Sequence, residues 1–261
     1  MTSLPPSSPS RPTALASPEH ANGSREASTP LRAPATLQKL HLGCGLVTPP
    51  DWLNVDGSLN ARLGKFPFVR SLARAVGLTG STARFDKSVF GHDLRRPLPW
   101  PEATFGAIYA SHLFEHMYVD EVKRLLLECR RVLAPGGALR VVVPDVAVLV
   151  RGYVTGDFPA WTADHIHHGP RADMMITGLL MRDRVAPRGR LLTRVYHAMF
   201  DFHSHKWMYD SESMTARFTE AGFAEVRRMG FGESRIDGIL DVEREIRVSD
   251  GAGVVIEGLR L

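Results

Sequence analysis

The fold class is decided by the stretch Leu40-His41-Leu42-Gly43-Cys44-Gly45, in which a short apolar strand is followed directly by a glycine turn. The two glycines of this turn let the backbone approach a ligand, because no Cβ is in the way. A Gly-x-Gly pair is a weak signal by itself, since tight turns often contain one. A nicotinamide dinucleotide fingerprint would have a third glycine where this chain has Thr48, so the turn argues against a nicotinamide-dependent oxidoreductase.

Further strands and helices follow the turn in the alternating order that is typical of α/β proteins. The connection at 46–51 is short and holds two prolines, so it leaves little room for a helix. Pro135-Gly136-Gly137 is expected to end the helix that precedes it. We predict helices at 66–76, 119–133 and 211–222, and strands at 40–42, 52–56, 105–110, 139–143, 225–229 and 253–259.

Two segments fall outside this alternation. Residues 1–36 are rich in Ser, Pro, Ala and Thr and have almost no large apolar side chains, so we expect a disordered tail. Residues 37–261 are expected to form one domain. Within it, residues 150–209 are rich in His, Arg and Met and are interpreted as an inserted cap.

The composition excludes several classes of protein. The net charge is +4, but basic residues are scattered among acidic ones, which gives little support for a nucleic-acid partner. With 2 cysteines there is neither a disulfide framework nor a four-cysteine zinc site. No stretch of 18 apolar residues occurs, so we expect no membrane span, and we expect the protein to be cytoplasmic.

Two aspartates are candidates for contacts with a nucleoside. Asp56 closes the strand at 52–56, where a carboxylate can accept hydrogens from both hydroxyls of a ribose. Asp93 could accept from an adenine amino group while the amide of Leu94 donates to the ring. The alternatives are an exposed aspartate at a strand end for Asp56 and a turn-capping aspartate for Asp93.

Polar residues also follow the strand at 105–110, in the order Ser111-His112-Leu113-Phe114-Glu115-His116. Groups just past the carboxyl end of a parallel strand lie where ligands bind in open α/β sheets. If the segment is helical, His112 and His116 share a face and form a proton-handling cluster with Glu115. The alternative is that at least one histidine serves capping or packing.

The cap contains the histidine groups 165–168 and 203–205, which superficially resemble metal ligands. No carboxylate lies at a diagnostic spacing from them, so we expect no bound metal. His205 stands beside Trp207 and Tyr209 and is a candidate for a residue that faces the substrate.

Taken together, these motifs resemble class I S-adenosylmethionine-dependent methyltransferases, particularly a small bacterial group associated with sugar or natural-product methylation. The resemblance is strong over residues 38–145 and weaker at 205–209 and 220–223. It implies a Rossmann-like α/β fold, with a mostly parallel seven-stranded sheet flanked by helices, over a methyltransferase domain at 37–261.

The resemblance also implies the cofactor, S-adenosyl-L-methionine, and a role for each motif. Gly43, Cys44 and Gly45 would pass under its methionine portion. Asp56 would hold the ribose, and Asp93 with Leu94 would contact the adenine. Ser111 and His112 would lie beside the methionine end and face the substrate.

The sequence therefore predicts a methyltransferase that acts on a small-molecule or saccharide-like acceptor, by O-methylation. A histidine is the natural general base for a hydroxyl acceptor. His112 or His116 is expected to take this role, with His205 as a further candidate. The alternative is a non-catalytic protein that uses a degenerate methyltransferase fold to bind the cofactor or a partner. The oligomeric state stays open.

Overall fold

The computed structural model describes residues 38–58, 86–158, 170–179 and 204–261, all within one compact unit, Leu31–Leu261. The expected tail at 1–36, the expected helix at 66–76 and much of the expected cap lie outside the described residues. Among the described residues, every helix is too short or too polar to cross a membrane.

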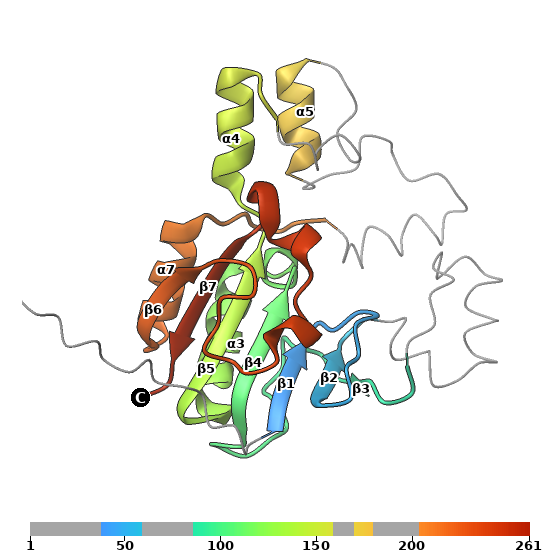
Figure 1. The fold of residues 1–261 in the computed structure, drawn as a ribbon, viewed down its shortest axis with the longest axis vertical. Coiled ribbons are helices and arrows are strands. Elements are labelled where there is room, and N and C mark those ends of the chain that lie inside the picture. The colour runs from blue at the N-terminus through green and yellow to red at the C-terminus, as the bar shows by residue number, and fades with distance from the viewer. Residues whose placement is uncertain (1–37, 59–85, 159–169, 180–203) are drawn as a thin grey trace, which may run out of the picture. The chain divides into compact units, whose positions relative to one another are not determined.

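The predicted mostly parallel seven-stranded sheet is confirmed (Figure 1). Its strand order is β3-β2-β1-β4-β5-β7-β6. Strands β1 to β5 run parallel to one another, whereas β7 is antiparallel to both β5 and β6. The strands are β1 (Gln38–Leu42), β2 (Trp52–Asp56), β3 (Phe90–Gly91), β4 (Phe105–Ser111), β5 (Leu133–Val143), β6 (Ala224–Met229) and β7 (Val254–Leu259).

The predicted helices at 119–133 and 211–222 are confirmed as α3 (Val119–Val132) and α7 (Ser211–Glu220). The sequence did not predict α4 (Val146–Thr155) and α5 (Arg171–Gly178). Short 3-10 turns complete the fold: η1 (Phe114–His116), η3 (Ile239–Asp241), η4 (Glu245–Arg247) and η5 (Ser249–Gly251).

The predicted role of Pro135-Gly136-Gly137 as the end of helix α3 was wrong. Helix α3 stops at Val132 and β5 begins at the next residue, so Pro135-Gly136-Gly137 lies inside the strand. Gly136 has a φ of 77°, and the register of β4 on β5 shifts at this point. The proline and glycines therefore form an irregular start to the strand rather than a helix stop.

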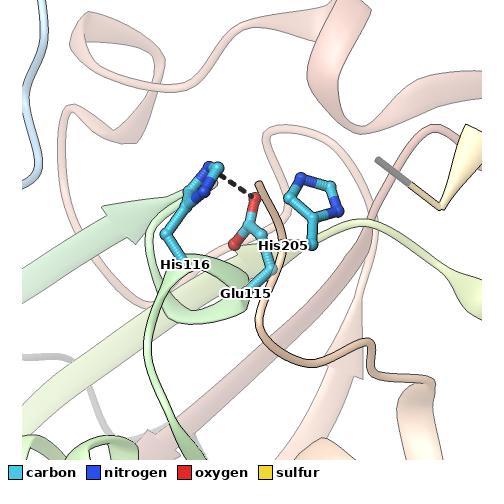
Figure 2. Close-up of side chains that lie close together, drawn as sticks. All are labelled: Glu115, His116 and His205. Atoms are coloured by element: carbon cyan, nitrogen blue, oxygen red, sulfur yellow. Dashed lines mark ion pairs between the residues drawn. The ribbon is translucent and has the colours of Figure 1, made fainter. Parts of the chain in front are cut away.

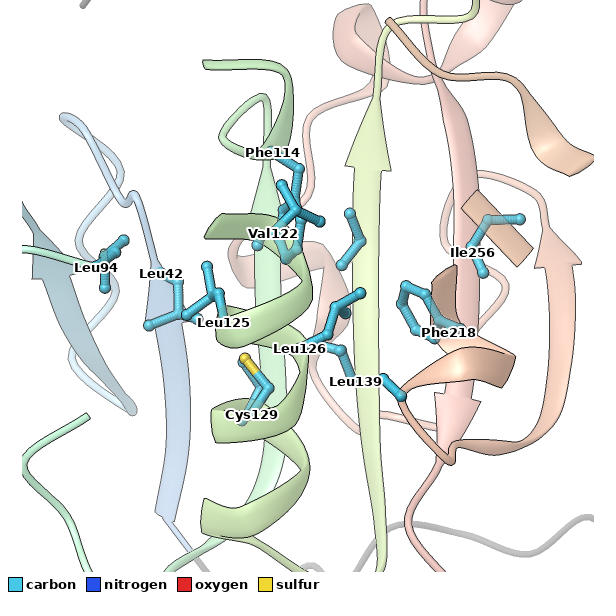
Figure 3. Close-up of a cluster of buried hydrophobic side chains, with 14 of the residues drawn as sticks. Leu42, Leu94, Phe114, Val122, Leu125, Leu126, Cys129, Leu139, Phe218 and Ile256 are labelled. Carbon is cyan, nitrogen blue, oxygen red and sulfur yellow. The ribbon is translucent and has the colours of Figure 1, made fainter. Parts of the chain in front are cut away.

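Helices α3 and α7 cover one face of the sheet, and Figure 3 shows their apolar side chains packed against the strands. Side chains alternate between the two faces of each strand. In β4, Ile108 and Ala110 face the helices, whereas Ala107 and Tyr109 face the opposite side. That opposite side is covered by the chain that leads into β7, through Ile236, Ile239, Val242 and Val248. Both faces are therefore buried, as expected for a parallel sheet.

A buried cluster of charged side chains joins the segment that precedes β7 to the sheet. The guanidinium of Arg140, in β5, forms two hydrogen bonds of 2.8 Å to the carboxylate of Glu243. It also lies 3.4 Å from Glu257 of β7 and donates to the main-chain oxygens of Gly230 and Glu233. Arg140 and Glu257 are fully buried and Glu243 nearly so, so the cluster replaces lost hydration with direct contacts.

The strand order reverses between β1 and β4. From β1 the chain proceeds to β2 and β3 on one side, and then returns to build β4 and β5 on the other. In open α/β sheets, ligands bind outside the carboxyl ends of the strands at such a reversal. The turn at 43–45 and the segment 111–116 follow β1 and β4 respectively, so both lie at this position.

Candidate functional site

The glycine turn after β1 requires glycine at both ends. Gly43 and Gly45 have φ angles of 65° and 54°, a conformation that costs residues with a Cβ about 1–2 kcal/mol. A Cβ on Gly43 would lie 3.3 Å from Leu113, so the turn packs closely against the segment that follows β4. Cys44 is buried, and burial raises the pKa of its thiol to about 12. The thiol therefore stays protonated near neutral pH.

Asp56, at the end of β2, holds the glycine turn through hydrogen bonds to the main chain. One carboxylate oxygen accepts the amide hydrogen of Gly45 at 3.0 Å, and the other accepts that of Ser58 at 2.8 Å. A carboxylate oxygen can accept two hydrogen bonds. Asp56 is therefore fixed in place by the chain itself and keeps capacity for the hydroxyls of a ligand.

Asp93, the predicted adenine contact, forms an ion pair that was not predicted from the sequence. Arg95 donates to both carboxylate oxygens of Asp93 at 2.8 Å. The side chain of Leu94 is buried in the core. The loop lies near the end of β2, because a Cβ on Gly57 would come within 2.6 Å of the carbonyl oxygen of His92.

The segment after β4 begins with a strained histidine. Ser111 is the last residue of the strand, and the next residue, His112, has a φ of 51°. Its amide donates to Val142 of β5 at 2.9 Å. A positive φ at a residue with a Cβ costs about 1–3 kcal/mol and is concentrated at functional sites. This backbone conformation turns the chain out of the sheet at His112. His112 and His116 therefore do not lie on one face of a helix, as the sequence suggested.

The two histidines instead lie around a buried carboxylate. Glu115, in η1, is fully buried. Its Oε1 lies 3.3 Å from Nδ1 of His112 and 4.0 Å from Nε2 of His116. The predicted cluster of His112, Glu115 and His116 therefore exists, and Glu115 lies at its centre.

His205 joins the same cluster from a distant part of the chain, as Figure 2 shows. Its ring centroid lies 5.0 Å from that of His116. The carbonyl oxygen of Glu115 accepts the amide hydrogens of Lys206 at 2.6 Å and Trp207 at 3.2 Å. These two bonds fix the segment before α7 against η1 and so place the nearly buried His205 beside Glu115.

The electrostatics of the cluster keep Glu115 charged. Burial by itself would raise its pKa, but the hydrogen bond and charge of His112, with a contribution from His116, bring the pKa of this carboxyl below its usual value. For His205, burial lowers the pKa of the imidazole although the charge of Glu115 opposes this shift. The site therefore combines a buried anion with a histidine that favours its neutral form.

The predicted site residues form two groups. Gly43, Gly45 and Asp56 are joined by direct contacts at the ends of β1 and β2. The histidines are gathered around Glu115, after β4. The central position of Glu115 was not predicted from the sequence, although its place between His112 and His116 could have indicated it. The close contact of Gly43 with Leu113 brings the two groups side by side.

Comparison with protein families relates part of the chain to a known domain. Residues 40–141 match the family described as a methyltransferase domain. No curated protein sequence matches the chain significantly.

Several solved structures match the chain at low sequence identity. An S-adenosylmethionine-dependent methyltransferase from Methanosarcina mazei is 17% identical, with a TM-score of 0.43, over 85% of this chain and 92% of that one. One from Thermotoga maritima is 17% identical, with a TM-score of 0.41, over 86% and 83%. The structure of PigF with SAH is 15% identical, with a TM-score of 0.41, over 85% and 56%, so this chain spans little more than half of PigF.

The family match covers β1, β2, β3, β4, α3 and most of β5, the elements that surround the reversal of strand order. Residues 40–141 of the chain are therefore similar to a methyltransferase domain.

Proposed function

We propose that the protein transfers a methyl group from S-adenosyl-L-methionine to a hydroxyl of a small-molecule or saccharide-like acceptor. The observation that carries this proposal is the cluster of His112, Glu115 and His116 directly beside the glycine turn, at the reversal of strand order. The glycine turn and Asp56 suit a nucleoside, and the histidine cluster suits removal of a proton from the acceptor.

The residues at the ends of β1 and β2 fit the cofactor, which supplies a methyl group carried on a sulfonium. Asp56 is held by two backbone amides and can still accept the hydrogens of two ribose hydroxyls. The backbone of Gly43, Cys44 and Gly45 is open to close approach because neither glycine carries a Cβ. No helix follows β1 within 43–51, so these groups bind the ligand without the N-terminus of a first helix.

The loop after β3 would contact the adenine. The backbone of Leu94 is the donor in this proposal and Asp93 is the acceptor. Because Arg95 already donates to both oxygens of Asp93, the carboxylate would keep its orientation whether or not a ligand is bound. Arg95 is thus a positioning residue for this contact.

His112 is the group best placed to remove the acceptor proton. Its Nδ1 lies 3.3 Å from Oε1 of Glu115, and in this proposal it donates a hydrogen to that oxygen when an acceptor is bound. That hydrogen bond leaves Nε2 to take the proton, and the carbonyl oxygen of Arg247, 3.4 Å from Nε2, can then accept a hydrogen bond from it. General-base catalysis of this kind contributes about 10²–10⁴-fold in rate. His116 and His205 complete the same cluster.

The competing function is a protein that holds the cofactor or a partner without catalysis. Titration calorimetry with the demethylated cofactor, S-adenosylhomocysteine, tests the part that both functions share. We expect saturable binding that weakens at least about tenfold in Asp56→Asn, because the amide cannot accept at both positions. Asp51→Asn, at an exposed aspartate before β2, is the matched control. Absence of binding would refute both functions.

Turnover separates the two functions. Incubation with S-adenosylmethionine and a panel of sugars, glycosides and phenols should release S-adenosylhomocysteine with at least one acceptor. Cofactor binding without release for any hydroxyl acceptor in the panel would favour the non-catalytic protein.

A further inference from the structure

Glu115, His116 and His205 form a set of donors that suits a metal ion. One ligand atom from each residue lies within 4.8 Å of those of the other two. Glu115 contributes a buried carboxylate, and neither of its oxygens has a hydrogen-bond partner among the described residues. Buried carboxylate oxygens normally have such partners, so a ligand bound between Oε1 and the two histidines would supply the missing contact.

The outer contacts of the two histidines orient both rings for coordination. Nδ1 of His116 lies 3.4 Å from the carbonyl oxygen of Ser204, which can only accept a hydrogen bond. Nδ1 of His205 lies 3.1 Å from the sulfur of Met208, which is also an acceptor. With the hydrogen on Nδ1 in both rings, Nε2 presents its lone pair to the cluster. Histidines that bind metals are commonly held in this way, by a backbone carbonyl or another acceptor on the second nitrogen.

We propose that Glu115, His116 and His205 bind a divalent ion of the first transition series, with Zn²⁺ as the reference ion. Two imidazoles and one carboxylate are the donor set of many zinc sites that keep a position open for water or substrate. Imidazole ligands favour such ions over Mg²⁺ and Ca²⁺, which prefer oxygen. No metal was expected from the sequence, because Glu115 and His205 lie far apart along the chain.

The distances allow this site with small movements. Zn²⁺ binds nitrogen and oxygen at about 2.0–2.2 Å, so two atoms on one tetrahedral ion lie about 3.4 Å apart. Nε2 of His116 and Oε1 of Glu115 are 4.0 Å apart, and the donor atoms of the three residues all lie within 4.8 Å of one another. Movements of the side chains by about an ångström would bring the three atoms into range. His112 then donates to the coordinated carboxylate, as a neighbour that orients a ligand.

The ion gives the site a second means of activating an acceptor, an inference that rests on the proposed function. A hydroxyl oxygen in the open position would be polarised by the ion, which lowers the pKa of the hydroxyl. Its proton would pass to Nε2 of His112. The acceptor class is therefore one with a hydroxyl that can coordinate a metal, such as a sugar diol or a catechol.

Metal binding is tested on the full chain after removal of bound ions with a chelator. Titration with Zn²⁺ alone, followed by calorimetry and elemental analysis, should give one ion per chain. Glu115→Gln and His205→Ala should each weaken binding at least about 100-fold, with unchanged thermal unfolding of the metal-free protein. The control variant replaces His165, His167 and His168, the other histidine group of the sequence, and should bind Zn²⁺ as the unaltered chain does.

Three results would overturn the inference: no stoichiometric Zn²⁺, full binding in both cluster variants, or loss of binding in the control variant alone. If a cluster variant fails to fold, metal binding is tested instead on the unaltered chain, by titration with Co²⁺. Intense visible absorption would support coordination by the protein, and the spectrum of the aqueous ion would contradict it. Titration with S-adenosylhomocysteine in the absence of metal distinguishes this failure from failure of the proposed function.

Discussion

The carbonyl oxygen of Glu115 accepts the amide hydrogen of Lys206 at 2.6 Å. This bond joins η1, at the end of β4, to the segment that precedes α7. His205 is the neighbour of Lys206, so its distance from the carboxylate of Glu115 depends on a main-chain contact rather than on a side chain. The assembly of the histidine cluster is therefore open to a test that leaves each of its side chains intact.

Lys206→Pro removes that amide hydrogen. We expect turnover to fall about 100-fold, because a displacement of about an ångström in a catalytic group has an effect of that size. Lys206→Ala keeps the amide and should stay within about threefold of the unaltered protein. Steady-state kinetics and thermal unfolding of both variants provide the measurement, and equal turnover in the two would contradict the role of this bond.

His112→Ala and Glu115→Gln should both lower kcat, by about 10²–10⁴-fold. The affinity for S-adenosylhomocysteine should fall much less than kcat, since neither residue contacts the nucleoside in our proposal. Glu212→Gln, at an exposed glutamate on α7, serves as a control for loss of a carboxylate. A loss of cofactor affinity equal to the loss of kcat would show that the cluster binds the cofactor instead.

Gly43→Ala and Gly45→Ala differ in what the new methyl group meets. Both positions have positive φ angles, which costs each variant about 1–2 kcal/mol of stability. At Gly43 the Cβ would also press on Leu113 at 3.3 Å, whereas at Gly45 nothing lies within 4 Å. We expect Gly43→Ala to show the lower unfolding temperature and to weaken S-adenosylhomocysteine binding more. The opposite order would mean that the packing of the turn on Leu113 is unimportant.

His41 should make stability depend on pH. It lies buried in β1 with Nδ1 3.3 Å from Oδ1 of Asn54, and burial lowers its pKa from 6.5 to about 4. Between these values the unfolded chain binds a proton that the folded chain does not. The free energy of unfolding is therefore unaffected by the titration of His41 above pH 6.5. As the pH falls from 6.5 toward 4, it decreases by about 3 kcal/mol in total.

His41→Gln tests this contribution, because glutamine does not titrate. Urea unfolding at several pH values between 4 and 7 should show a shallower loss of stability in the variant. Parallel curves for the two proteins would contradict the buried, neutral state of His41.

Arg140→Ala should destabilise the protein by about 3–5 kcal/mol, because it leaves Glu243 and Glu257 buried without their cation. Arg228→Ala removes an exposed arginine of β6 that lies 3.9 Å from Asp145, and should change stability by less than about 1 kcal/mol. Chemical unfolding of both variants gives the comparison. Similar values for the two would show that the buried cluster contributes little.

Much of the fold could be predicted because its signals are local. The strands at 52–56 and 105–110 and the helices at 119–133 and 211–222 follow from apolar periodicity and were confirmed. The error at 135–137 arose because proline and glycine end helices and also permit irregular strands. Only the pairing of β4 with β5 distinguishes these outcomes, and that pairing is not a local property of the sequence.

The candidate site was predictable only in part, for a related reason. Asp56 and the glycine turn are close in sequence and in space, and the motif resemblance named both. The central position of Glu115 depends on His205, which reaches it through main-chain bonds to a distant segment. A search for metal ligands by spacing along the chain passes over such a set, because the carboxylate and the histidine meet only after folding.

The sheet ends at β6, whose outer side has no neighbouring strand among the described residues. An open edge of this kind can pair with another chain and start aggregation. In β6 the exposed positions are Glu225, Arg227 and Arg228, and the register with β7 is broken between Ala224 and Arg227. Charge and irregular backbone together make this edge a poor template for an incoming strand, so the sheet can stay open without promoting self-association.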